Sequence, residues 1–152
     1  MNIILKTLAE AKQYLRKNFK VGTECPCCGR FVKAYKRKLN AGMARALIII
    51  YKLTKNGNSI HVQDRFTKLG LRATTMDYAY LEKWNLIQSH VTNGYWSITQ
   101  LGKEFVEDDI DLPDHCLVYN TKVYHWSDTL INIDTALTEE FDIDEIMKIT
   151  EI

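Results

Sequence analysis

The chain has 152 residues, of which 46% are hydrophobic and 26% charged, which is enough for one globular domain with a core or for one small domain with appendages, and we do not expect a multidomain enzyme. Its net charge of +1 hides a strong asymmetry: residues 1–72 carry sixteen Lys and Arg against three acids, whereas residues 73–152 carry four Lys against sixteen acids. These counts give +13 and −12, and a half this basic is typical of proteins that bind nucleic acid, although neutralisation within the fold or across a homodimer is the alternative.

The N-terminal residues do not form a secretory signal peptide, because only three consecutive residues are apolar before the segment becomes basic. No apolar run approaches the roughly 20 residues that a membrane span needs. We therefore expect no membrane partner and a cytoplasmic location. In that compartment the four Cys are expected to be free thiols or metal ligands rather than disulfides.

Residues 3–18 place Ile4, Leu8, Ala11 and Leu15 at helical spacing, which predicts an amphipathic helix with its basic residues on the opposite side. Gly22 and a cysteine cluster follow. The helix is therefore expected to end before them.

The cluster contains Cys25 and Cys28 with Pro26 and Gly29, the pattern of a zinc knuckle. Tetrahedral zinc needs four ligands, and the chain has no second Cys-x-x-Cys pair. Three alternatives stay open: a knuckle completed from the tail by two of His115, Cys116 and His125, a zinc ion shared between two chains, or a turn without metal. We prefer the turn without metal. Zinc is thus a candidate cofactor only.

Residues 31–39 alternate in a way that is compatible with a strand or extended ribbon. Their cations surround an aromatic residue, and the pattern favours a strip that binds nucleic-acid backbones and stacks on bases. The strip contains Lys33, Tyr35, Lys36, Arg37 and Lys38.

Asn40 is expected to cap a buried helix over residues 41–55. A short basic helix over 62–69 and a third helix that begins after Thr74-Thr75 and runs to about Trp84 are expected next. Asn93-Gly94 then predicts a type I′ hairpin between strands 88–92 and 95–99. In such an arrangement phosphate and base contacts would come from Arg45, Arg65, Lys68, Arg72, Thr74, Thr75 and Tyr78.

The phrase YLEKWNLIQSHVTNGYWSITQLGKEFV resembles the last half of winged-helix domains of the MarR or PadR kind. Two short motifs carry the match, one before the wing that resembles LexxGLI and one after it that resembles LTxxGxxFl. Asn85 stands in place of the usual glycine of the first motif. The matching residues are Leu81, Glu82, Trp84, Leu86 and Ile87, then Ile98, Thr99, Gly102 and Phe105. The resemblance implies a helix-turn-helix followed by a two-stranded wing, and DNA as the ligand.

Most of the chain is also similar to small phage-encoded proteins that join a CPxCG segment and a YKRKLNxGMA-like phrase to a winged-helix region. The first part is carried by Cys25 to Gly29. The second is carried by Tyr35 to Asn40 and Gly42 to Ala44. This resemblance implies a phage origin, and hence the host cytoplasm, without implying a mechanism.

The tail predicts a hairpin around Asn120-Thr121, a strand near 130–133 and short helices over 133–137 and 141–149. The expected fold is therefore α+β, a winged helix-turn-helix core with two additions. The expected divisions are residues 1–39 for the N-terminal helix, knuckle and strip, 40–108 for the winged helix, and 109–152 for an acidic appendage packed on the core.

No sequence pattern indicates catalysis, because the chain lacks a phosphate-binding glycine loop, HExxH and GxSxG. The third helix carries Asp77 and Glu82, which would repel a DNA backbone. We therefore expect a non-enzymatic nucleic-acid-binding protein that uses its basic half. The alternative is an inhibitor or adaptor that binds a host or phage protein through its acidic half.

Overall fold

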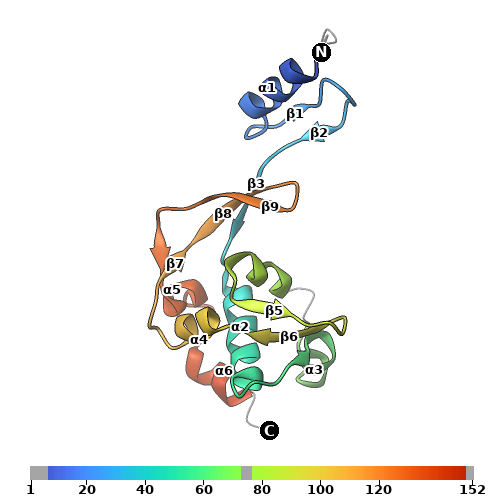
Figure 1. The fold of residues 1–152 in the computed structure, drawn as a ribbon. Coiled ribbons are helices and arrows are strands. Elements are labelled where there is room, and N and C mark those ends of the chain that lie inside the picture. Colours follow the sequence, from blue (N-terminus) through green and yellow to red (C-terminus); the bar gives the residue numbers. More distant parts are fainter. Residues whose placement is uncertain (1–6, 73–76, 150–152) are drawn as a thin grey trace. The chain divides into compact units, whose positions relative to one another are not determined.

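A computed structural model of the chain describes residues 7–72 and 77–149. It shows a mixed α+β fold in which the described strands form several small sheets of two or three strands (Figure 1). The residues fall into two compact units, a basic unit of Met1–Arg37 with His115–Trp126 and a core unit of Lys38–Asp114 with Ser127–Ile152. This grouping differs from the expected three divisions, because a hairpin from the acidic half of the chain packs with the N-terminal segment.

Helix α1 of the basic unit spans Leu8–Asn18 and starts with a capping box, in which Thr7 and Glu10 each bond the other's backbone N–H. Strands β1 (Thr23–Glu24) and β2 (Phe31–Val32) then pair antiparallel around the cysteine cluster. The expected helix is thus present where the chain is described, since residues 1–6 lie outside that part.

A three-stranded sheet completes the basic unit, and only the last residue of its first strand, Lys38, is grouped with the core unit. Its strand order is β3-β8-β9, with β3 at Tyr35–Lys38, β8 at His115–Tyr119 and β9 at Lys122–Trp126. Asn120 and Thr121 connect β8 to β9 and both take positive φ, 50° and 67°. The two-residue hairpin turn predicted from the sequence is confirmed.

Helix α2, Ala41–Thr54, is the centre of the core unit. Asn40 caps it as predicted, because its Oδ1 accepts the Met43 N–H at 2.9 Å. Residues on every side of the helix are buried, including the run Leu47 to Ile50. Several elements pack around it: helices α4 (Gln100–Val106), α5 (Ile133–Leu137) and α6 (Ile143–Ile149), the 3₁₀ helix η2 (Tyr78–Trp84) and strand β6 (Tyr95–Ile98).

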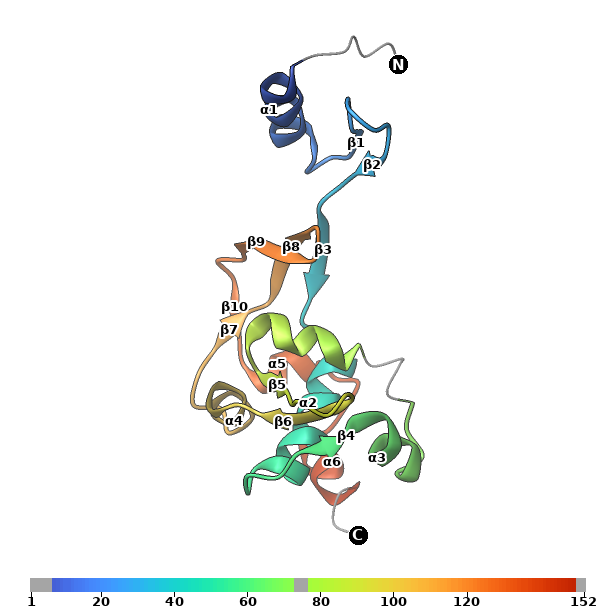
Figure 2. The same cartoon turned by 45° about the vertical axis from the view of Figure 1, so that its right-hand side comes forward.

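A second three-stranded sheet lies against α2, in the order β4-β6-β5 (Figure 2). Its strands are β4 (Ile60–His61), β5 (Ile87–Ser89) and β6 (Tyr95–Ile98), while helix α3 (Val62–Lys68) and η2 (Tyr78–Trp84) lie between β4 and β5 in the chain. Of the two turn residues only Gly94 has positive φ, 83°. The β5–β6 hairpin is therefore present, but the predicted type I′ turn is wrong because Asn93 keeps negative φ.

The two phrases that suggested the winged helix have a local physical explanation. Asn85 ends η2 in the left-handed conformation, at φ 60°. Glycine is usual at this position, and asparagine can replace it because it also tolerates this conformation. Thr99 accepts the Gly102 N–H at 3.0 Å, and its hydroxyl donates to the Asn85 carbonyl at 2.7 Å. Gly102 lies on helix α4 (Gln100–Val106), where a Cβ would come within 2.3 Å of the Leu86 carbonyl oxygen. Glycine thus lets α4 approach the backbone after η2.

The rest of the tail packs on the core unit through short elements. Strands β7 (Leu112–Pro113) and β10 (Leu130–Ile131) pair, and helices α5 (Ile133–Leu137) and α6 (Ile143–Ile149) contact α2. The Lys52 ammonium donates to the Met147 carbonyl at 2.6 Å. Among the helices that the structure describes, none has the length and apolar character needed to cross a bilayer.

Candidate functional site

The basic unit carries a clear excess of positive charge, although it holds only part of the charge of residues 1–72. Its residues include ten Lys and Arg against the two acids Glu10 and Glu24, a net +8, which leaves −7 for the core unit. The hairpin 115–126 contributes Lys122 and two His, and it contains no acid. Although the hairpin 115–126 comes from the acidic half of the sequence, it does not neutralise the positive charge of the N-terminal segment.

Strand β3 presents the strip that was expected from the sequence. All four residues from Tyr35 to Lys38 are exposed, and β3 is an edge strand of its sheet. The Lys33 ammonium lies 5.9 Å from the centroid of the Tyr35 ring, a cation–π contact that keeps the ring beside the charges. Basic residues on an edge strand also prevent edge-to-edge aggregation, so the strip alone does not establish a ligand.

A group of aromatic residues lies next to this sheet, and the sequence analysis did not include it in the site. The Phe19 ring at the end of α1 makes edge contacts with Tyr119 at 5.0 Å and Tyr124 at 5.2 Å between centroids. Tyr124 and Trp126 on β9 are each 37% exposed. The signal in the sequence was the hairpin VYNTKVYHW, in which three of nine residues are aromatic.

The cysteine cluster forms a tight hairpin loop between β1 and β2. The Cys25 N–H donates to the Arg30 carbonyl at 2.7 Å, and the Gly29 N–H donates to the Cys25 carbonyl at 2.9 Å. The backbone N–H groups of Cys27 and Cys28 point at the Cys25 sulfur and lower the pKa of its thiol. The loop therefore favours a thiolate at Cys25.

The proposed zinc ligands from the tail do not join this loop. Cys116 is buried in β8, and His115 is half-buried beside it. Within residues 7–72 and 77–149, no three or more His, Cys, Asp or Glu side chains are arranged to hold a metal ion. Among the described residues, neither His115 nor Cys116 joins Cys25 and Cys28 in a ligand set.

The remaining predicted contact residues belong to the core unit. Arg65 and Lys68 on α3 are exposed, as is Arg72, whereas Thr74 and Thr75 lie outside the described residues. Arg45 is half-buried, with its guanidinium carbon 4.8 Å from the centroid of Phe141. Its packing against the tail makes it a structural contact.

Tyr78 was expected on the exposed side of the third helix, and this expectation is wrong. The residue is 9% exposed, and its ring packs against Phe66 and Trp96 at 6.4 and 6.1 Å between centroids. Its burial follows from the 3₁₀ geometry of η2, because a 3₁₀ helix has three residues per turn and changes which side chains face the core. The amphipathic pattern assumed an α-helical period there.

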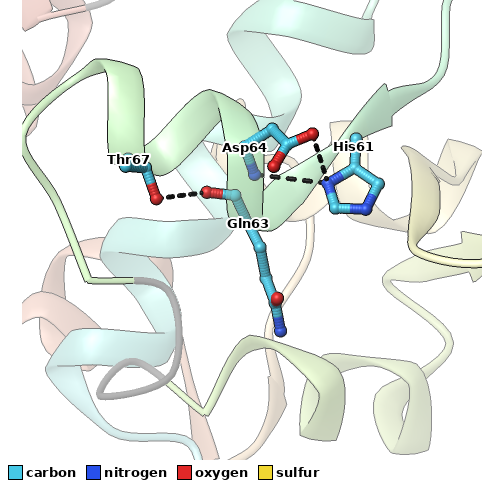
Figure 3. A network of polar contacts seen from close by, with 4 residues as sticks. All are labelled: His61, Gln63, Asp64 and Thr67. Carbon is cyan, nitrogen blue, oxygen red and sulfur yellow. Dashed lines mark hydrogen bonds and ion pairs between the residues drawn. The ribbon is translucent and has the colours of Figure 1, made fainter.

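His61 caps α3 and has a local carboxylate partner (Figure 3). Its Nδ1 lies 3.2 Å from the Asp64 N–H and 3.3 Å from the Asp64 Oδ2, so the neutral ring accepts the N–H and the protonated ring binds the carboxylate. Thr67 donates to the Gln63 carbonyl at 2.7 Å in the next turn. These contacts stabilise the first turns of α3 and do not form a ligand site.

Comparison with protein-family models finds no match for this chain, and comparisons with curated proteins and with solved structures find none either.

Proposed function

We propose that the chain is a non-enzymatic nucleic-acid-binding protein, and that the basic unit provides the binding surface. The observation that carries the proposal is the net charge of +8 on Met1–Arg37 with His115–Trp126, in a chain whose total is +1. Lys and Arg on a surface bind phosphates by releasing counterions, without any need for a base sequence. The exposed Tyr35 and the aromatic residues on β9 supply rings on which bases stack.

The core unit is best described as a winged-helix variant. The order α2, β4, α3, η2, β5, β6 with sheet order β4-β6-β5 supports this proposal, as does the resemblance to MarR and PadR domains. Its third helix is poorly suited to a major groove, because Tyr78 is buried while Asp77 and Glu82 are exposed acids. We therefore assign the core unit a scaffold role and place nucleic-acid contacts on the basic unit.

A second candidate function follows from the charge of the core unit. Glu107, Asp108 and Asp109 form an exposed acidic segment after α4, and the unit as a whole has a net charge of −7. A surface of this kind complements a basic partner protein. In that case the chain is an inhibitor or adaptor of a host or phage protein, and its basic unit need not bind nucleic acid.

Two triple variants separate these functions. The first replaces Lys36, Arg37 and Lys38 by Ala, and the second, with the same loss of charge, replaces Arg65, Lys68 and Arg72. Affinity for a 20-nucleotide single strand and for a duplex is measured by fluorescence anisotropy over a range of salt concentrations. The β3 variant is expected to flatten the slope of log affinity against log salt by about 2 to 3, as three lost phosphate contacts require.

The core-unit variant is the matched control and is expected to leave the slope nearly unchanged. A larger loss from the core-unit variant would instead assign the contacts to the winged helix. If the wild-type chain bound neither DNA at low salt, the nucleic-acid proposal would be wrong and the protein-partner function would take its place.

A further inference from the structure

A pocket in the basic unit lies between α1 and the hairpin of β8 and β9. Its volume is about 320 Å³, and Lys12, Leu15, Arg16, Phe19 and Tyr119 line it. The volume is at the lower end of the range for small-ligand sites in proteins. None of the residues proposed from the sequence for nucleic-acid binding lines it, so it is a separate feature of the basic unit.

The walls of the pocket are apolar and aromatic. Leu15 is half-buried, and the Phe19 and Tyr119 rings meet edge to face at an interplanar angle of 60°. Tyr124 contacts the same Phe19 ring, so an exposed aromatic side chain continues from the pocket onto the sheet. A planar aromatic group bound in this pocket can contact the faces and edges of these rings.

The edge of the pocket is cationic. Lys12 and Arg16 are both exposed and are four residues apart on α1, which puts them on one side of the helix about one turn apart. Of the described residues that line the pocket, none is acidic. A ligand that fits must therefore combine a flat apolar part with a negative group a few ångströms away.

We propose that this pocket binds one unpaired base of a single-stranded nucleic acid, with the neighbouring phosphate held by Lys12 and Arg16. The inference rests on the proposed function and adds a preference to it, since a base stacked inside a duplex cannot enter. Aromatic residues that stack a base beside cations that hold the backbone are the usual means by which proteins bind single strands. The pocket thereby favours a single strand over a duplex of equal charge.

The first experiment uses the wild-type chain and two polymers that differ only in their bases. A 20-nucleotide oligothymidylate and an abasic 20-mer carry the same phosphates. The oligothymidylate is expected to bind about 5- to 150-fold more tightly, which corresponds to about 1–3 kcal/mol for one stacked base, with the same salt slope for both. Equal, salt-dependent affinity for the two polymers would overturn the pocket and leave the proposed function intact. Absence of binding to both would overturn the proposed function, and the pocket with it.

Two variants locate the effect. Leu15→Trp fills the pocket from the helix, and Tyr119→Leu removes one ring while it keeps an apolar side chain. Each is expected to remove most of the difference between the two polymers, whereas the matched control Tyr35→Leu removes an exposed ring outside the pocket and should lose only the smaller share that this ring contributes. Retention of the full difference in both pocket variants would overturn the inference.

A crosslinking measurement does not depend on how the variants fold. An oligothymidylate with one 5-iodouracil is irradiated with the wild-type chain, and the modified peptides are identified by mass spectrometry. Crosslinks at Phe19 or Tyr119 are expected. Crosslinks confined to Tyr35 or to the core unit would show that the bases lie elsewhere and would overturn the pocket.

Discussion

Thr54 makes a buried connection between the central helix and the β4-β6-β5 sheet, and its loss should have a measurable cost. The side chain is 1% exposed. Its hydroxyl donates to the Ile50 carbonyl at 2.7 Å and accepts the Ile98 N–H of β6 at 2.9 Å. Thr54→Val keeps the shape of the side chain and removes both bonds, so the Ile98 N–H is left buried without an acceptor.

An unsatisfied buried donor costs about 1 to 3 kcal/mol. For a chain of this size each kcal/mol lowers the melting temperature by about 2 to 4 °C. Thr54→Val should therefore melt several degrees below the wild type. The amide of Ile98 should also lose protection from hydrogen exchange, because its acceptor is gone.

Thr67 provides a matched control from the same residue type. Its hydroxyl makes the same bond to the carbonyl four residues earlier, at 2.7 Å to Gln63, but it is exposed (Figure 3). Water replaces that bond in Thr67→Val, so the free energy of unfolding should change by less than about 0.5 kcal/mol. Equal melting temperatures for the two variants would refute the argument that the buried bridge to Ile98 is the source of the stability.

Two further outcomes are expected from single side chains. Burial and, as a smaller cause, the nearby Glu107 carboxylate raise the pKa of Tyr51, so the folded chain still holds this proton at a pH where the unfolded chain has released it. The contribution of Tyr51 to the free energy of unfolding is therefore constant below pH 10 and falls as the pH rises above 10. Melting curves at alkaline pH should show a smaller fall in the melting temperature of Tyr51→Phe than of the wild type. The backbone N–H groups of Cys27 and Cys28 lower the pKa of Cys25. In the double variant Cys27→Ser, Cys28→Ser, iodoacetamide should therefore modify Cys25 at a lower pH than it modifies a cysteine in an unstructured peptide. Mass spectrometry measures the extent of modification at each pH. Chelator treatment should leave the melting temperature of the wild type unchanged if the knuckle is a turn without metal, and a clear fall would show a structural ion.

The local parts of the fold were predictable because their signals lie within a few residues. Asn40 caps α2, and Asn120-Thr121 turns between β8 and β9, as side-chain chemistry and hairpin spacing predicted. Burial at Tyr78 was missed because the helical pattern does not distinguish a 3₁₀ period from an α period over seven residues. The turn at Asn93-Gly94 was missed for a similar reason, since the dipeptide is compatible with more than one turn type.

The candidate site was only half predictable. The strip on β3 was visible as a run of cations around Tyr35, and the structure exposes all four β3 residues. The pocket beside it combines Phe19 with Tyr119, which are 100 positions apart in the chain. No periodicity links such residues, because their contact depends on which strands pair. Sequence charge likewise assigned the hairpin 115–126 to an acidic tail, although the hairpin itself carries no acid.

The pairing of β3 with β8 also sets the order in which the chain can fold during synthesis. Strand β3 leaves the ribosome about 80 residues before its sheet partner β8, and the other edge strand, β9, ends at Trp126. A nascent chain therefore carries its cationic segment without a partner strand while most of the core unit is being made. Domains usually fold as continuous units during translation, but here the unit that contains α1 and β3 cannot be completed until the hairpin 115–126 has been made. A ribosome stalled before residue 115 should hold a protease-sensitive N-terminal segment, which becomes protected once the hairpin has emerged.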